Sequence, residues 1–260
     1  MRTGQALVAA ASLAVLLAAC GGAGQVGAGA VPHVSPSGQP LTYVAVGASE
    51  SVGIGATDPV RDAWPQVFFR TALPRAATMV DLGIPGATVG DALREELPRA
   101  TGLHPDVVTV WLNVNDLVHG VAPTEYEAQL TALLRDLRAG GSTEVLVANT
   151  PPLDHLPRLL ECQPFAPAPE GGCDRSRELP ISVVDAGVGQ YNQAIARAAV
   201  ATGAIVVDLH AWGEGVQQSG HLDRFVGIDG WHPSTYGYQQ IAAVFAQAYR
   251  STSSTPAPSP

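Results

Sequence analysis

The chain has 260 residues, a formal net charge of −9 and an apolar content of 46%. This length and composition fit one large domain with a sizeable core, and they exclude global disorder. Acidic residues are not concentrated in long runs and no basic patch occurs, so nucleic acid is not an expected partner.

The N-terminus has the pattern of an export signal. Arg2 precedes a nearly uninterrupted apolar stretch over residues 6–19, which is too short and too alanine-rich for a spanning helix. The stretch ends in the letters LAAC, of which the last is Cys20, and this ending resembles a bacterial lipobox. We therefore expect residues 1–20 to be a lipoprotein signal peptide with Cys20 lipidated. An ordinary secretory signal with a cysteine near its cleavage site is the alternative.

The first half of the chain is predicted to alternate strands with helices after a flexible tether. Residues 21–40 are rich in glycine, alanine, proline and serine, which is typical of such a tether. Val89, Leu93 and Leu97 have the spacing of a helix that Pro98 ends. Three largely apolar runs are typical of strands buried on both faces, and they cover residues 42–46, 78–82 and 107–112.

The middle of the chain adds a helix, a strand and a loop. Thr124 and Glu127 form a capping-box signature at the start of a helix that Gly140-Gly141 stops. A fourth apolar run at residues 144–148 predicts another strand. The proline-rich stretch over residues 151–180 interrupts the alternation, so we expect a long loop beside the functional site.

The last part of the chain returns to the alternation and then ends in a tail. Apolar residues from Val184 to Ala199 predict a helix that Gly203 ends. A fifth strand is expected at residues 204–208 and a last helix from Tyr238 to Tyr249. Residues 251–260 are rich in serine, threonine and proline and are predicted to be a disordered tail, so the folded domain should span residues 41–250.

Three cysteines occur in the sequence. If Cys20 carries lipid, Cys162 and Cys173 remain as a pair in an exported protein, where disulfides persist, so we expect a disulfide between them. Two free thiols are the alternative. Two cysteines without a nearby histidine do not make a zinc site, and the histidines show no metal-ligand spacing. Neither a metal ion nor another cofactor is therefore expected.

Strands that alternate with helices predict an α/β fold with a parallel sheet covered on both faces. Right-handed crossovers place the functional loops of such a sheet at the carboxyl ends of its strands. Ser49 follows the first predicted strand, Gly86 the second, and Asn113 and Asn115 the third. We therefore expect these residues at one edge of the sheet.

Three of the residues could form a nucleophilic centre. Ser49 lies between Gly47 and Gly53, which allow a sharp turn, and Asp229 and His232 lie three positions apart near the other end of the chain. A serine needs a base to become a nucleophile, and the base needs an orienting carboxylate. Each segment also has a plainer interpretation, because a serine often caps a helix and an aspartate often forms a turn.

Two further segments offer donors to a developing oxyanion. An amide side chain such as that of Asn115 and a glycine N–H such as that of Gly86 are suited to this task. Turn formation is the plainer role of both residues. Taken singly, neither segment decides between the two roles.

The four segments in this order resemble the SGNH hydrolases, also called the GDSL esterase family. The blocks are Gly47-Ala48-Ser49, Gly86, Asn115 with Asp116, and Asp229 to His232, and the resemblance covers residues 41–250. It implies a three-layer α/β/α sandwich with a five-stranded parallel sheet in flavodoxin-like order. It also implies catalytic and oxyanion-hole roles for these blocks.

By this resemblance, Ser49 is the nucleophile, His232 is the base and Asp229 orients His232. The oxyanion hole is formed by the N–H groups of Ser49 and Gly86 and by the Asn115 amide. A non-catalytic module or a nucleotide binder is disfavoured, the latter because no Walker sequence or Gly-rich fingerprint follows the first strand.

Two positions depart from the family pattern. Ala48 stands where the family usually has aspartate, and Asn113 stands where glycine is usual. Both changes affect the expected substrate more than the expected mechanism. Candidate substrate contacts are Asn113, His155 and Trp231, because loops at this edge of a sheet often carry binding residues.

The resemblance and the export signal together predict an extracytoplasmic serine esterase. Its substrate would be a small-molecule, glycan or lipid ester, and the lack of an apparent long apolar lid favours short acyl groups. The protein would be anchored by lipid to the outer face of the bacterial membrane. The alternative is a non-catalytic, glycan-binding envelope lipoprotein that keeps the hydrolase fold, which the changes at Ala48 and Asn113 motivate.

Overall fold

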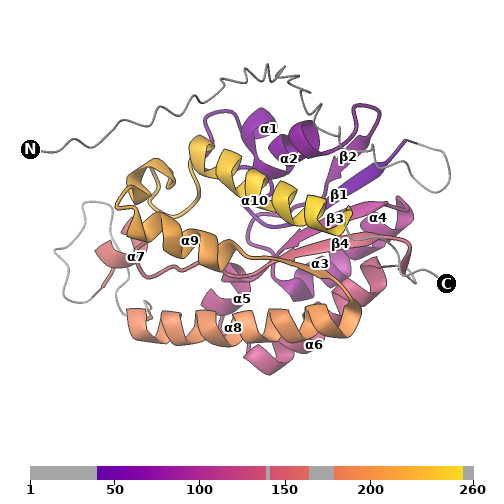
Figure 1. Ribbon diagram of the computed structural model, residues 1–260. Helices are drawn as coiled ribbons and strands as arrows, with labels where there is room; N and C mark the ends of the chain where they lie inside the picture. Colours follow the sequence, from indigo (N-terminus) through magenta and orange to yellow (C-terminus); the bar gives the residue numbers. More distant parts are fainter. Residues whose placement is uncertain (1–39, 139–140, 164–178, 254–260) are drawn as a thin grey trace, which may run out of the picture. The chain divides into compact units, whose positions relative to one another are not determined.

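The computed structural model describes residues 40–138, 141–163 and 179–253. Its centre is a five-stranded sheet in the order β2-β1-β3-β4-β5, with every pair of neighbours parallel (Figure 1). This order is the flavodoxin-like one, so the predicted fold class is confirmed. The strands are β1 (Thr42–Gly47), β2 (Thr78–Asp81), β3 (Val107–Trp111), β4 (Glu144–Ala148) and β5 (Ile205–Val207).

Helices cover both faces of the sheet (Figure 1). They are α1 (Pro59–Asp62), α2 (Trp64–Ala72), α3 (Val89–Glu95), α4 (Leu97–Gly102), α5 (Val114–Val118), α6 (Pro123–Leu137), α7 (Pro157–Glu161), α8 (Ile181–Thr202), α9 (Leu209–Gln218) and α10 (Thr235–Ser253), with a 3₁₀ turn at Leu222–Arg224.

The side chains of the three inner strands β1, β3 and β4 alternate between two cores. Val44 and Val46 of β1 belong to a core shared with α3, α6 and α8, whereas Tyr43 and Ala45 belong to a core shared with α2 and α10. These inner strands therefore have to be largely apolar on both faces, whereas the edge strands β2 and β5 are partly exposed. The result is the three-layer sandwich.

The pairing of β1 with β3 fixes the position of the functional loops. Gly47 lies opposite Trp111 in this pair, so the loops after the two strands leave the sheet side by side. β2 on one side and β3 on the other make β1 the point where the strand order reverses. Ligands of open α/β sheets bind at the carboxyl ends of the strands at such a point.

Several details differ from the sequence-based expectations. α6 begins at Pro123, Thr124 forms no cap, and Glu127 instead binds Arg197 of α8. The predicted capping box is therefore wrong, because Pro123 is favoured in the first turn and moves the start of the helix. Pro98 likewise lies in the first turn of α4, which begins at Leu97, rather than ending a helix.

Two other boundaries are shifted. α10 continues to Ser253, so residues 251–253 are helical and not part of a tail. The stretch after Pro151 includes the short helix α7, in addition to loop. Gly203 has a left-handed conformation (φ 72°) at the end of α8, which confirms its predicted role as the stop of that helix.

Some predictions concern residues outside the described ranges. These are the signal peptide over residues 1–20 with Cys20, the tether up to residue 39, Cys173 and the end of the chain from residue 254. Cys162 is described and is buried. Within the described residues, no helix is long and apolar enough to cross a membrane. In the same ranges, no three His, Cys, Asp or Glu side chains are grouped in a way that would hold a metal ion.

Candidate active site

The structure brings together a serine, a histidine and an aspartate from the two ends of the domain. The Ser49 Oγ lies 3.0 Å from the His232 Nε2, and the His232 Nδ1 lies 2.6 Å from the Asp229 Oδ2. Serine and histidine are 183 positions apart in the sequence. The arrangement has the connectivity that a nucleophile, its base and an orienting carboxylate require.

Ser49 owes its position to a tight turn at the end of β1. The Ser51 N–H donates to the Ala48 carbonyl at 3.1 Å, which reverses the chain directly after the strand. Gly47 is needed there, because a Cβ at this position would lie 2.0 Å from the Ser51 Oγ. Gly53 has a φ of 81°, which glycine adopts without strain. The turn presents the Ser49 hydroxyl toward His232.

The His232 loop is held by its own backbone. The Asp229 Oδ1 accepts hydrogen bonds from the N–H groups of Trp231 and His232, each at 3.0 Å. Behind them, the Gly227 N–H donates to the His232 carbonyl at 2.7 Å, and Gly230 has a φ of 70°. One Asp229 oxygen therefore shapes the loop while the other contacts the imidazole.

The Asp229 contact determines which nitrogen of His232 carries the proton. Burial alone would raise the pKa of Asp229, but the N–H groups of Trp231 and His232 and the imidazole hold that pKa below its ordinary value. Because the ionised carboxylate accepts hydrogen bonds, the His232 Nδ1–H is the donor. The Nε2 of the neutral ring then has a lone pair directed at the Ser49 hydroxyl.

The expected oxyanion donors lie on neighbouring loops. Within the described residues, the N–H groups of Ser49 and Gly86 donate no hydrogen bond to the protein, so both can bind a ligand. The Asn115 Nδ2 donates to the carbonyl of Ala87 at 3.0 Å, which holds the amide against the loop of Gly86. Gly86 has a φ of 83°, a conformation that strains other residues.

The two departures from the family pattern have structural consequences. Ala48 is buried in the core on the side of α6 and α8, where an aspartate would need polar partners. The Asn113 side chain is also buried, and its Nδ2 lies 3.4 Å from the Ala148 carbonyl. Asn113 was predicted to contact the substrate, but it is not among the residues that line the apolar pocket described below.

Asp116 holds the loop between β2 and α3. Its side chain is fully buried, and both of its oxygens accept the N–H of Val89 at 3.1 Å. Burial raises the pKa of Asp116 to about 6 despite these hydrogen bonds. It therefore acts on the loop that carries Gly86 rather than on the serine.

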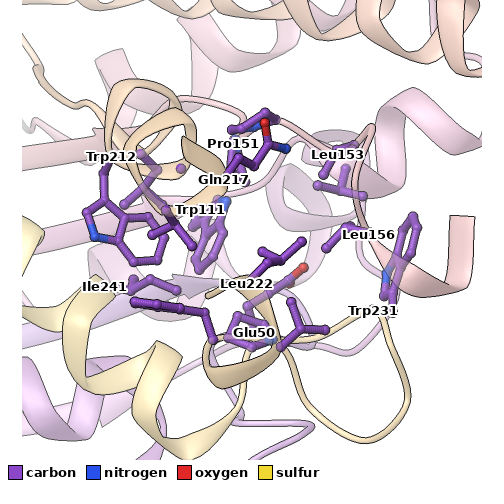
Figure 2. A pocket seen from close by; sticks show the side chains of 18 residues that line it. Glu50, Trp111, Pro151, Leu153, Leu156, Trp212, Gln217, Leu222, Trp231 and Ile241 are labelled. Atoms are coloured by element: carbon purple, nitrogen blue, oxygen red, sulfur yellow. The ribbon is translucent and has the colours of Figure 1, made fainter. Parts of the chain in front are cut away.

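A mostly apolar pocket, whose lining side chains Figure 2 shows, includes the chain neighbours of Ser49 and His232 in its wall. It encloses about 740 Å³ of empty space, open solvent at its mouth included. Trp231 and Pro233, which flank His232, form part of its wall. The predicted contact Trp231 therefore lines the pocket, whereas His155 does not and instead pairs with Asp154 at 2.8 Å.

Glu50, the residue directly after the serine, was not predicted from the sequence to belong to the site. Its carboxylate lines the pocket, and its Oε2 lies 3.3 Å from the Ser49 Oγ. Burial raises the pKa of Glu50. The only signal in the sequence was its position next to Ser49, and that position alone does not reveal which way the side chain points.

Glu96 was also missed. Its side chain is fully buried, and its Oε2 accepts the N–H of Gly47 at 2.8 Å, one residue before the turn that carries Ser49. Burial, together with a smaller contribution from the neighbouring Asp81, raises the pKa of Glu96 to about 8, although the Gly47 N–H acts to lower it. The contact spans 49 positions, so no local pattern predicts it.

The comparison with protein families agrees with this geometry. Residues 45–240 match the model of the GDSL-like lipase/acylhydrolase family. The chain belongs to this family. The predicted resemblance is thereby confirmed, and so is the predicted class of enzyme, a serine hydrolase that cleaves esters. No curated protein matched this GDSL hydrolase in sequence.

Solved structures share the fold of this GDSL hydrolase at low sequence identity. A lipase/acylhydrolase from Enterococcus faecalis is 19% identical with a TM-score of 0.59, and the match covers 82% of this chain and 96% of that one. The esterase EstA from a Pseudoalteromonas species, inhibited by monoethylphosphonate, is 15% identical with a TM-score of 0.57. This match covers 81% of the present chain and 97% of EstA. A two-domain esterase active on acetylated mannans is 16% identical with a TM-score of 0.60. This match covers 86% of the present chain and 54% of the two-domain esterase.

Proposed function

We propose that this GDSL hydrolase is an extracytoplasmic esterase that cleaves carboxylic esters, with short acyl groups favoured, through an acyl-enzyme on Ser49. The observation that carries the proposal is the continuous chain of contacts from the Ser49 Oγ through His232 to Asp229, with distances of 3.0 and 2.6 Å. A serine without such a base remains a weak nucleophile.

In the first half of the reaction, the Ser49 Oγ bonds to the ester carbonyl carbon while the His232 Nε2 takes the hydroxyl proton. The carbonyl oxygen becomes an oxyanion, which the N–H groups of Ser49 and Gly86 and the Asn115 amide stabilise. His232 then gives its proton to the leaving alcohol as the carbon–oxygen bond breaks, and the acyl group stays on Ser49.

In the second half, His232 takes a proton from a water molecule that attacks the acyl carbon. The oxyanion forms again at the same donors, and the proton returns to Ser49 as the acid leaves. Asp229 stays ionised throughout, because its lowered pKa favours the carboxylate, and it stabilises the imidazolium in both halves.

The substrate is proposed at the level of class. A glycan O-acyl ester is supported by the structural neighbour that acts on acetylated mannans, and a lipid ester by the expected membrane anchor. Short acyl groups are proposed because the sequence contains no apparent long apolar lid. A series of nitrophenyl esters of increasing acyl length tests this, and a maximum of kcat/KM at long chains would contradict it.

The cellular location is likewise a proposal. The sequence at Cys20 supports lipidation and anchoring at the outer face of the membrane, and export in turn supports a disulfide between Cys162 and Cys173. Replacing Cys20 by serine should release the protein from the membrane fraction. Recovery of the variant in that fraction, unchanged in amount, would contradict lipid anchoring.

The first experiment labels the protein without its first 20 residues with a fluorophosphonate probe at neutral pH. We expect labelling of the wild type and none of the Ser49→Ala variant, together with loss of ester turnover. Circular dichroism and thermal unfolding of both proteins establish that the variant is folded. Failure of the folded wild type to label would favour the non-catalytic, glycan-binding alternative.

A further inference from the structure

The pocket beside the triad has an unusual composition. Among the 18 described residues that line it, Glu50 is the only ionisable one. If the tryptophans are set aside, Gln217 is the only other lining residue with a polar side chain. Apolar side chains make up most of the wall. An ordinary pocket for an acyl chain needs only apolar walls, so the Glu50 carboxylate requires another explanation.

Aromatic side chains form part of the wall of the same pocket. Three of the four tryptophans of the chain, Trp111, Trp212 and Trp231, line the pocket together with Phe225. Figure 2 shows Glu50 between Trp231 on one side and Trp111 and Trp212 on the other. Tryptophan faces attract cations more strongly than other rings do, and the attraction grows when the cation leaves water.

Within the described part of the chain, the group that attracts the Glu50 carboxylate electrostatically is His232, and it does so only while its ring is protonated. No arginine there forms an ion pair with it, and its side-chain hydrogen-bond partner is the Ser49 Oγ at 3.3 Å. That hydroxyl also has the closer partner His232 at 3.0 Å, so it offers Glu50 a weak contact. A partly desolvated carboxylate without a permanent cation beside it is costly, and a positively charged ligand would relieve that cost.

We propose that this pocket binds an alkylammonium group and that the preferred substrates are therefore esters that carry such a cation near the ester bond. Glu50 supplies the negative charge and the tryptophans supply the cation–π surface. The inference rests on the proposed esterase function, because it specifies which part of the substrate lies beside Ser49.

Other occupants fit the pocket less well. A plain alkyl chain would leave the Glu50 carboxylate without a partner in an apolar environment. A sugar ring would need several hydrogen-bond partners, and the wall offers the side chains of Glu50 and Gln217, of which Gln217 already donates to Asp154 at 2.8 Å. An alkylammonium group satisfies both the charge and the apolar wall.

The test compares substrates that differ in charge but not in shape. Acetylcholine and its neutral isostere 3,3-dimethylbutyl acetate place the difference on the alcohol side. Methyl esters of 4-(trimethylammonio)butyrate and of 5,5-dimethylhexanoate place it on the acyl side. For wild type we expect kcat/KM to favour the cation by at least about tenfold in one of the two pairs. Within each variant the measured quantity is this ratio.

The isosteric variant Glu50→Gln should bring the ratio close to one, and Trp212→Leu should lower it. Glu125→Gln is the matched control, because it removes the same charge from an exposed side chain of α6. Glu125→Gln should keep the wild-type ratio, also in 0.5 M NaCl, where attraction by distant surface charges is screened. An equal ratio in wild type and Glu50→Gln would overturn the inference.

A binding measurement makes the result independent of turnover. Tetramethylammonium should change the tryptophan fluorescence of the Ser49→Ala protein saturably, tert-butanol should not, and the double variant with Glu50→Gln should lose the response. No saturable response overturns the cation site even if esters are hydrolysed. If the neutral esters are hydrolysed with a ratio near one, the inference fails while the esterase function stands. If the folded wild type neither hydrolyses any ester nor reacts with the fluorophosphonate, the esterase function fails.

Discussion

Asp229 performs two tasks with one side chain. Its Oδ1 accepts two backbone N–H groups and shapes the loop, while its Oδ2 contacts the His232 Nδ1. A residue with these two tasks is sensitive to the loss of charge, even when its shape is preserved. The substitution Asp229→Asn separates charge from shape.

We expect Asp229→Asn to lower kcat on the order of 10³- to 10⁴-fold, because the amide can leave His232 in the wrong tautomer and cannot stabilise the imidazolium. Steady-state hydrolysis of a nitrophenyl ester measures the effect. The matched control is Asp136→Asn on the exposed side of α6, which should change kcat less than about twofold because it lies outside the catalytic chain of contacts. A comparable loss in both variants would argue against the proposed role of Asp229.

Glu96 makes the stability of the protein depend on pH. Its pKa is about 8 in the fold against an ordinary value of 4.5. Between these values the unfolded chain releases the proton and the folded protein keeps it, so the free energy of unfolding falls as the pH rises from about 4.5 to about 8. The total loss is on the order of a few kcal/mol.

The variant Glu96→Gln should remove this contribution while retaining an acceptor for the Gly47 N–H. Urea unfolding at several pH values between 5 and 8 is the measurement. The free energy of unfolding of the wild type should fall more steeply with pH than that of the variant. Asp81, whose pKa burial raises to about 6, titrates in both proteins, so the difference between the two curves isolates Glu96. Parallel curves would refute the buried, protonated state.

At the scale of elements, the first turn of α10 supports the His232 loop. Gly237 packs so closely that a Cβ there would lie 2.2 Å from the Phe225 carbonyl oxygen. The same carbonyl accepts the Ser234 N–H at 2.8 Å. The obstructing atoms belong to the backbone carbonyl of Phe225 and not to a flexible side chain, so the helix and the loop fit together only with glycine at this position.

Gly237→Ala should therefore destabilise the protein by about 1–3 kcal/mol through overpacking and should also lower ester turnover, because α10 or the loop has to shift. Gly189→Ala on the exposed face of α8 is the control, since a Cβ there meets nothing within 4 Å. That substitution should stabilise the protein by roughly 0.5–1 kcal/mol through helix propensity. Urea unfolding and nitrophenyl ester hydrolysis of both variants test the pair, and equal effects would contradict the close approach at Gly237.

At the scale of the whole molecule, buried aromatic packing should contribute more to the free energy of unfolding than surface ion pairs do. Phe245 of α10 stacks on Trp64 of α2 with ring centroids 4.0 Å apart, and both are fully buried. Arg197 of α8 binds Glu127 of α6 with its guanidinium exposed. Each contact joins two helices across one face of the sheet.

Phe245→Ala should cost about 3–5 kcal/mol of unfolding free energy, because it leaves a cavity beside Trp64. Arg197→Ala should cost less than about 1 kcal/mol, because an exposed ion pair is screened and its side chains lose entropy. Chemical unfolding of both variants at one ionic strength is sufficient. A larger effect at Arg197 than at Phe245 would show that packing against the sheet is not the main source of stability.

The sequence predicted the sheet well because parallel strands buried on both faces need continuous apolar runs. All five strands were located within two residues of their observed ends. Helices were predicted less completely. The short helices α1, α4, α5 and α7 were not predicted, and neither were α2 and α9. α9 contains Gly213 and Gly215, which weaken any helical pattern. Gly213 is there because a Cβ would lie 2.5 Å from Pro152, a contact that no local rule reveals.

The sequence by itself therefore determined the strands and the family, and it singled out the serine, histidine and aspartate that the structure brings together, since these follow from local composition and from the order of short motifs. Only the tertiary structure decided that Ser49 and His232 meet at 3.0 Å, that Glu96 holds the Gly47 N–H, and that Glu50 faces an aromatic pocket. The physical reason is that burial and charge environment arise from residues far apart in the chain. A side chain's sequence neighbours do not specify which of them will surround it.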